Sequence, residues 1–139
     1  MSRQPLLLAG ALAFFSSVAP AYADPCEAPL PTHAGARFSG TVRYVGDGDG
    51  LCVGRTADPR EWIEVRLADF DAPELHQANG AAAKAALERI ALLRQVRCTA
   101  ERGRSGRVVS FDRVIARCRI GSDSIGNLLR HAGAVAGGN

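Results

Sequence analysis

Aromatic residues are scarce in this chain of 139 residues, which holds one Trp, two Tyr and five Phe. A surface that binds its ligand by stacking on aromatic rings therefore has few candidates, namely Trp62, Tyr44 and Phe111. The composition thus argues against recognition that depends mainly on ring stacking.

The sequence also lacks the patterns of two common kinds of catalytic site. His33, His76 and His131 show no metal-ligand spacing, and we expect all three at the surface. Serines such as Ser105 and Ser110 have no accompanying Ser-His-Asp order, so nucleophilic catalysis by serine is not expected.

No apolar run is long enough to cross a membrane. Residues 6–15 are apolar, but two serines and a proline interrupt the run before the roughly 18 residues that a spanning helix needs. Arg3 ahead of this run and Ala21-Tyr22-Ala23 after it are typical of a secretory signal peptide (residues 1–23) cleaved after Ala23. We therefore expect a secreted or periplasmic protein, one small domain without stable membrane association.

Four cysteines follow this leader, and an even number in a small exported domain predicts disulfides. A zinc site is the alternative, but no Cys-x-x-Cys pair or matching histidine supports it. We expect Cys98 to pair with Cys118, because they fall on strands predicted to be neighbours. Cys26 would then pair with Cys52 and tie an N-terminal arm to the second strand.

The charge of the chain is mildly basic, at +3 overall and +2 once the single arginine of the leader is removed. This balance fits a nucleic-acid ligand without requiring one. Arg102, Arg104 and Arg107 crowd one loop that contains glycine and serine. The loop is either simply solvated or a basic lip that attracts polyphosphate.

Hydrophobic periodicity predicts a small, mainly β domain. Residues 24–37 contain three prolines and read as an extended arm. Alternating patterns predict five strands, over 38–45, from 51, and over 62–67, 96–100 and 114–120. A helix is expected over 80–95 with Asn79 as N-cap, and a short one over 124–132 with Asp123 as cap and Gly133 as stop.

This order of elements predicts the α+β class. We expect a five-stranded barrel of the oligonucleotide-binding type, with one helix between strands three and four and a short helix after strand five. The domain would occupy residues 38–136 and leave a tail at 137–139. The sequence contains no internal repeat.

Carboxylates gather at the end of the third expected strand. Asp69, Asp71 and Glu74 lie within six positions, and Asp47 and Asp49 lie in the preceding hairpin. Acids this close repel one another unless a cation or a shared proton offsets the charge, so a hard metal ion with oxygen ligands is expected. The alternative is that the Asp-Gly pairs of the hairpin only build a turn.

Arg66 precedes this acidic stretch and brings a guanidinium within reach of it. A metal ion polarises one oxygen of a phosphate ester, while an arginine fork holds two others. The stretch therefore predicts a site for an anionic phosphate ester.

Taken together, these motifs resemble the staphylococcal nuclease (thermonuclease-like) family. The resemblance rests on the order and spacing of five elements over nearly all of the domain. They are Asp47-Gly48-Asp49, Val65-Arg66-Leu67, Asp71-Ala72-Pro73-Glu74, Phe111-Asp112-Arg113 and Leu128-Leu129-Arg130-His131-Ala132-Gly133. The family has the same barrel fold, and its enzymes cut DNA and RNA with little sequence preference and leave 3′-phosphates.

The resemblance implies a metal site made of oxygen ligands. Asp49 and Asp71 are the expected ligands, with the backbone carbonyl of Ala72 as a third. Calcium is the expected ion, because it suits an all-oxygen shell completed by water.

The resemblance also implies three catalytic side chains. Glu74 is expected to act on the attacking water as general base or as orienter. Arg66 and Arg113 are expected to bind the scissile phosphate and to stabilise the charge of the transition state. Each arginine could instead form a structural ion pair with the acids nearby.

Three departures from the family pattern concern substrate affinity and stability. Gly50 stands where the family usually has threonine, Asp112 replaces a glycine and adds an acid beside Arg113, and the chain ends at Asn139 before the family's third helix. Two alternatives to a monomeric nuclease therefore stay open. One is an inactive barrel that binds nucleic acid or another anionic ligand, and the other is an envelope protein stabilised by calcium.

Overall fold

The computed structural model describes residues 24–137, so the expected signal peptide and the last two residues of the tail lie outside the described residues. The elements in chain order are β1 (Arg37–Val45), β2 (Gly50–Gly54), the 3-10 helix η1 (Pro59–Glu61), β3 (Ile63–Leu67), α1 (Gly80–Ala91), β4 (Gln95–Ala100), β5 (Val109–Ser110), β6 (Arg113–Ile120), β7 (Asp123–Ser124) and α2 (Ile125–His131).

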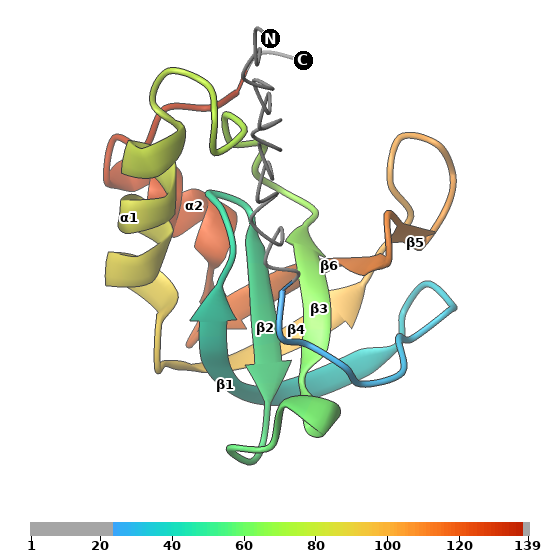
Figure 1. Ribbon diagram of the computed structural model, residues 1–139. Coiled ribbons are helices and arrows are strands. Elements are labelled where there is room, and N and C mark those ends of the chain that lie inside the picture. The colour runs from blue at the N-terminus through green and yellow to red at the C-terminus, as the bar shows by residue number, and fades with distance from the viewer. Residues whose placement is uncertain (1–23, 138–139) are drawn as a thin grey trace, which may run out of the picture.

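Five strands close into a barrel with both helices on one side (Figure 1). The path β3-β2-β1-β4-β6 is antiparallel throughout, and a parallel pairing of β3 with β6 closes it. The two-residue strands β5 and β7 each pair with β6. The expected α+β barrel of the oligonucleotide-binding kind, with a helix after its third and after its fifth long strand, is confirmed at this level.

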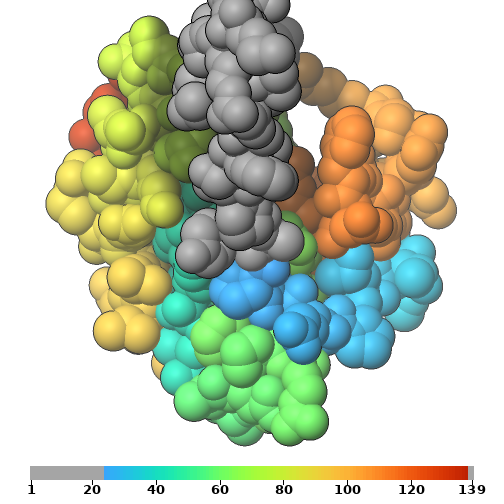
Figure 2. All heavy atoms as spheres, viewed as in Figure 1, coloured from blue at the N-terminus to red at the C-terminus, as the bar shows by residue number. Residues whose placement is uncertain are grey.

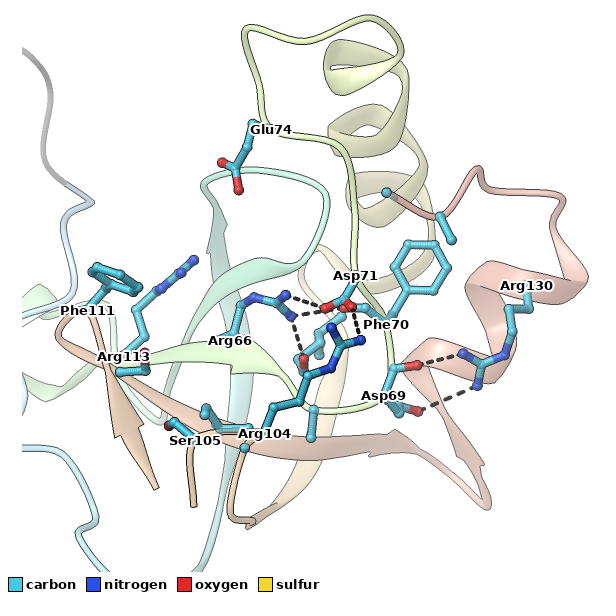
Figure 3. A pocket seen from close by; sticks show the side chains of 17 residues that line it. Arg66, Asp69, Phe70, Asp71, Glu74, Arg104, Ser105, Phe111, Arg113 and Arg130 are labelled. Carbon is cyan, nitrogen blue, oxygen red and sulfur yellow. Dashed lines mark hydrogen bonds and ion pairs between the residues drawn. The ribbon is translucent and has the colours of Figure 1, made fainter. Parts of the chain in front are cut away.

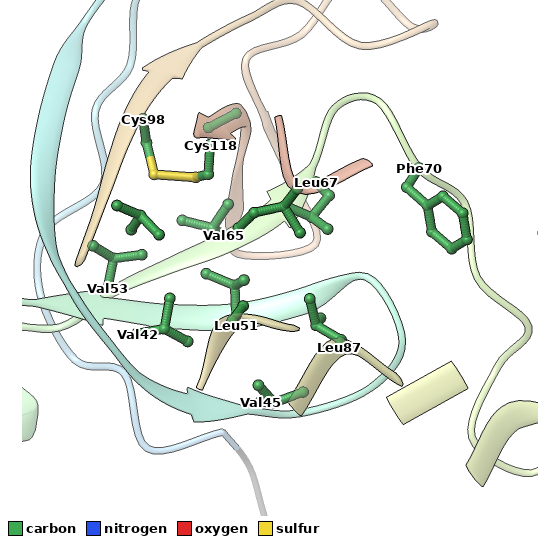
Figure 4. Packing of buried hydrophobic residues seen from close by; sticks show 14 of the residues in the cluster. Val42, Val45, Leu51, Val53, Val65, Leu67, Phe70, Leu87, Cys98 and Cys118 are labelled. Atoms are coloured by element: carbon green, nitrogen blue, oxygen red, sulfur yellow. A yellow bond between two sulfur atoms is a disulfide. The ribbon is translucent and has the colours of Figure 1, made fainter. Parts of the chain in front are cut away.

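The barrel interior is filled by branched side chains, with Leu87 of α1 among them (Figure 4). Strand β3 alternates as expected, with Val65 and Leu67 buried. In β1 the alternating pattern predicts that Val42 and Val45 lie on opposite faces. This is wrong, because a bulge between Val42 and Tyr44 turns both valines inward. The bulge lets one strand pair with β2 through its second half and with β4 through its first.

Helix α1 ends four residues before the expected position. Leu92 leaves the helical conformation and Leu93 takes a φ of 64°, which lets its N–H donate to the carbonyl of Val42 at 2.9 Å. This bond to β1 turns the chain into β4. Asn79 stands at the N-cap as expected, but its φ is 67° and its side chain makes no capping hydrogen bond.

The N-cap of α2 is Ser124, whose Oγ accepts from the N–H of Asn127 at 3.2 Å. The expectation that Asp123 caps this helix is wrong, because Asp123 belongs to β7 and pairs with Ile120. Gly133 follows the helix with a φ of 76°, in agreement with the expected stop.

Both expected disulfides are present. Cys98 and Cys118 are register partners on β4 and β6, with Cα atoms 4.1 Å apart, and their bridge faces the core (Figure 4). Cys26 joins the arm to Cys52 of β2, and the arm lies beside the 55–62 segment (Figure 2). Two bridges fit an oxidising compartment. Within residues 24–137, no helix has the length and apolar character to span a bilayer.

Candidate functional site

A cleft of about 680 Å³ opens where β3 ends, between the loop after β3 and the loop that joins β4 to β5 (Figure 3). Arg66, Asp71, Glu74 and Arg113 line this cleft, which we call the acidic cleft. Arg66 and Arg113 meet there because β3 and β6 are parallel neighbours, and Arg66 pairs in register with Ile115. Residues from three sequence motifs thus converge on one opening.

Arg66 lies at the centre of this cleft. Its Nη2 lies 2.5 Å from Oδ1 of Asp71 and 3.3 Å from Oδ2 of Asp49. Its Nη1 donates to the carbonyls of Leu67 at 2.7 Å and Phe70 at 3.0 Å. The side chain therefore closes the loop after β3 and neutralises two acids at once.

Asp49 lies behind Arg66 and is 5% exposed. Its Oδ2 accepts from the N–H of Ala72 at 2.8 Å, which joins the hairpin to the acidic loop. Burial raises the pKa of Asp49 to about 6, and the neighbouring Asp47 adds to the rise, while the Ala72 bond and Arg66 oppose it. A cation that reaches Asp49 would therefore stabilise its ionised form.

The donor set of the expected metal site is two carboxylates. Asp49 and Asp71 both point at one nitrogen of Arg66, so their oxygens converge as the ligands of a hard cation must. Among residues 24–137 no group of three or more His, Cys, Asp and Glu side chains is placed to hold a metal ion. The residues fit calcium provided that backbone carbonyl and water complete the shell and that the cation competes with Arg66.

Arg113 enters the cleft from β6. Its Nη1 lies 3.9 Å from Oδ2 of Asp47, whose Oδ1 accepts from the N–H of Asp49 at 3.1 Å. Asp47 is therefore the acid paired with Arg113 in the described part of the chain, and the neighbouring Asp112 forms no ion pair with it. Gly50 lies between Asp47 and Arg113, since a Cβ there would stand 2.8 Å from Oδ1 of Asp47 and 3.6 Å from Nη1 of Arg113.

Glu74 is exposed at the rim of the cleft, apart from Asp71 and Arg66 (Figure 3). Its backbone N–H donates to Oε1 of Gln77 at 2.9 Å, and its carboxylate forms no ion pair within the described residues. The carboxylate is therefore free to meet a molecule that enters the cleft.

The three arginines of the basic loop do not act alike. Arg104 lines the cleft, and its Nη2 lies 3.0 Å from Oδ2 of Asp71. Arg102 instead donates to the carbonyl of Gly106 at 2.9 Å inside the loop, and Arg107 does not line the cleft. The structure brings only one of the three to the site.

Asp69 does not join the other acids, although sequence spacing grouped it with them. Its buried carboxylate lies 3.4 Å from Nη1 of Arg117 and 3.9 Å from Nη2 of Arg130, on the side of α2. The turn that follows β3 rotates Asp69 away from Asp71 (Figure 3). Sequence reasoning gave Arg130 no role, yet Arg130 also lines the cleft.

Glu64 and Asp24 form a second acidic pair that the sequence did not suggest. Burial raises the pKa of Glu64 to about 7, and the neighbouring Asp24 raises it further, both as hydrogen-bond partner and as like charge. Asp24 also raises the pKa of Tyr44, although burial is the larger cause there. Because Asp24 belongs to the arm, only its tertiary placement could reveal this pair.

Comparison with models of known protein families finds none that matches the chain, and comparison with curated proteins finds no similar sequence.

Proposed function

We propose that this protein is an exported, calcium-dependent nuclease of the staphylococcal nuclease-like kind, which hydrolyses phosphodiester bonds of DNA or RNA. The observation that supports the proposal is the convergence of Arg66, Arg113, Asp71 and Glu74 on one open cleft, with Asp49 directly behind Arg66. Three of the motifs that carry the family resemblance are far apart in sequence, and their meeting at one cleft supports the proposal.

The arginines would receive the scissile phosphate. Arg66 and Arg113 reach the cleft from neighbouring strands, so two guanidinium groups can hold oxygens of one phosphate. Their present partners are carboxylates, which the phosphodiester would replace as it binds. The same contacts strengthen as charge builds on the phosphoryl oxygens in the transition state.

Glu74 would handle the attacking water. An exposed carboxylate without an ion pair can accept a proton from water as the new P–O bond forms and the bond to the 5′-oxygen breaks. The leaving oxygen takes its proton from solvent. The 3′-phosphate that this cleavage leaves is the product that the resemblance implies.

Asp49 and Asp71 would hold calcium, with the carbonyl of Ala72 as a further ligand. A divalent cation there supplies Lewis acidity to the phosphate and offsets the charge of the two acids. Because both acids now contact Nη2 of Arg66, a cation held by them would leave that guanidinium available to the substrate.

Phe111 lies at the mouth of the same cleft, opposite Asp69 and Arg130 (Figure 3). It is 90% exposed and has a φ of 51°, so the β5–β6 turn presents an apolar ring to solvent. Such a ring can stack on one base beside the phosphate, which favours a nucleic-acid substrate over an inorganic phosphate.

The test is hydrolysis of single-stranded DNA by the exported, disulfide-bonded protein, with calcium and with a chelator. We expect calcium-dependent cutting that the Glu74→Gln variant loses by at least about 100-fold in kcat, as for loss of a general base. Glu27→Gln is the matched control, because Glu27 is exposed and lies outside the cleft.

Other outcomes identify the alternatives. DNA binding without cutting would indicate an inactive binding barrel. Calcium-dependent stabilisation without any effect on DNA would indicate a structural protein. Cutting that survives Glu74→Gln would remove Glu74 from the mechanism.

A further inference from the structure

A second cleft of about 760 Å³ lies on the outer face of β1, β4 and β6. Its walls are dominated by one residue type. The lining residues are Arg37, Phe38, Ser39, Arg55, Arg97, Cys98, Thr99, Glu101, Arg117 and Arg119. We call this surface the arginine groove.

The arginines of the groove are set close together by strand register. Arg97 of β4 is the direct partner of Arg119 of β6, and both are exposed, while the next register pair, Cys98 and Cys118, faces inward. Like charges directly opposite one another destabilise a sheet. The pair therefore opposes folding, and an anionic ligand would remove that cost.

Most of these charges have no acidic partner. Within the described residues, Arg37, Arg55, Arg97 and Arg119 form no ion pair with a carboxylate. Arg97 and Arg119 donate only to the carbonyls of the β6–β7 turn. The one acid of the groove, Glu101, is already bound by Arg117 at 2.9 Å. The groove thus offers several guanidinium groups that can bind an anion.

The surroundings favour a polyphosphate over a membrane or an apolar protein partner. The large exposed apolar residues of the described chain are Leu75, Leu92, Leu93, Phe111 and Val135, and none lines the groove. Membrane-surface binding and stable protein interfaces both need an apolar contact beside the charges. A nucleic-acid backbone needs mainly the positive groove.

The groove is also continuous with the acidic cleft. Arg113, Ile115, Arg117 and Arg119 alternate along β6 and so share its outer face. The first two line the acidic cleft and the last two line the groove. Successive members are about 7 Å apart, so the row spans roughly 20 Å. A strand held at the cleft can follow β6 into the groove.

We propose that the arginine groove binds the phosphate backbone of a single-stranded nucleic acid on one side of the cleavage point. The groove would also make the protein cut long polynucleotides in preference to short ones, and this second statement rests on the proposed nuclease function. The binding statement does not, because the groove contains none of the proposed catalytic side chains.

The first test is binding without chemistry. Fluorescence anisotropy measures the binding of a 20-nucleotide oligomer to the wild type and to the Arg97→Gln/Arg119→Gln double variant. A chelator is present, and the titration is repeated over a series of salt concentrations. We expect roughly tenfold weaker binding and a slope of log K against log salt reduced by about 1.4, or 0.7 for each lost phosphate contact. Arg89→Gln/Arg94→Gln is the control of equal charge change, since both arginines are exposed and line neither cleft.

Thermal unfolding of the same variants separates binding from folding. The groove variant should melt no lower than the wild type, because the substitution removes a repulsive cross-strand pair. A lower melting temperature together with weaker binding would mean that the arginines are structural and would overturn the proposal.

The second test uses bis(p-nitrophenyl) phosphate beside long single-stranded DNA. The groove variant should keep kcat and KM on the small ester and raise KM on DNA. An equal loss on both substrates would overturn the groove. If no protein cuts either substrate, the proposed function fails, while the anisotropy result still decides the groove. The groove would instead be a membrane-binding surface if the protein binds phosphatidylserine vesicles and if the groove and control variants bind the oligomer equally well. That result would overturn the proposal.

Discussion

Nη2 of Arg66 lies 2.5 Å from Oδ1 of Asp71, and the same nitrogen lies 3.3 Å from Oδ2 of Asp49. A single guanidinium therefore stands where a shared cation would neutralise both acids. The hairpin that holds Asp49 and the loop that holds Asp71 are joined through this nitrogen and through the Asp49–Ala72 bond.

Replacing Arg66 with Gln should leave two close carboxylates without a cation. We expect a loss of about 3 kcal/mol in unfolding free energy, at the low end for breaking a buried ion pair because Arg66 is partly exposed. Calcium should restore more stability to the variant than it adds to the wild type, since the competing guanidinium is gone. Denaturant unfolding with and without calcium measures both effects.

Arg113→Gln is the matched control for this experiment. Arg113 is as buried as Arg66, but its nearest acid lies 3.9 Å away and it closes no loop, so its loss should cost less. An Arg66 variant that is no more stabilised by calcium than the wild type would contradict the two-carboxylate site.

Arg104 and Arg102 allow a paired test of the basic loop. Arg104 contacts Asp71 in the cleft, whereas Arg102 bonds to its own loop. We expect Arg104→Gln to raise KM for DNA roughly three- to tenfold, as for one exposed charge contact, and Arg102→Gln to change it little. Equal effects of the two substitutions would indicate a general electrostatic lip rather than one placed side chain.

The two disulfides should differ in how much stability is lost when each is removed. Replacing Cys98 and Cys118 by Ala removes a bridge inside the core, where both residues are at most 2% exposed. We expect the unfolding free energy to fall by about 3 kcal/mol, because the unfolded chain regains conformational freedom. The volume left empty in the core adds a further cost. Replacing Cys26 and Cys52 should cost about 3 kcal/mol and release the arm.

Activity on DNA separates these two variants further. The arm does not line the acidic cleft, so the Cys26–Cys52 variant should keep its activity at temperatures where it is folded. A larger stability loss in the Cys26–Cys52 variant than in the Cys98–Cys118 variant would contradict the expected extra cost of removing the core bridge.

The barrel could be predicted because its signals are local. Alternation marked β3 and β6, and the order of the elements made the strands of Cys98 and Cys118 neighbours, as β4 and β6 are. The early end of α1 was not predictable from periodicity, because Leu93 is turned out of the helix by a bond to β1, which is distant in sequence. The same holds for the bulge in β1, which serves closure of the barrel.

The sequence predicted which residues line the cleft better than it predicted which of them form ion pairs with one another. Spacing identified Arg66, Asp71 and Glu74, which do line one cleft. It could not foresee that Asp69 turns toward α2, since a turn after a strand breaks the alternation that would group it with Asp71. The arginine groove could not be predicted for a related reason, because most of its members come from three strands and meet only through register.

The Glu64–Asp24 pair predicts how stability depends on pH. The pKa of Glu64 is about 7 in the folded protein against a reference of 4.5, because burial and Asp24 disfavour its charge, Asp112 adds to this and Arg113 opposes it. Between these values the folded state binds more protons than the unfolded state, so stability falls as pH rises from about 4.5 to about 7.

Glu64→Gln should remove this contribution and flatten the dependence, most clearly between pH 6 and 7, above the pKa of about 6 that burial gives Asp49. Urea unfolding of wild type and variant at half-unit steps from pH 5 to pH 8 measures the difference. Glu27→Gln, an equal change of charge at an exposed residue of the arm that holds Asp24, should leave the wild-type slope intact. Stability that rises over this range in the wild type, or a slope that Glu64→Gln does not reduce, would show that Glu64 is ionised in the folded protein and that the arm does not hold Asp24 against it.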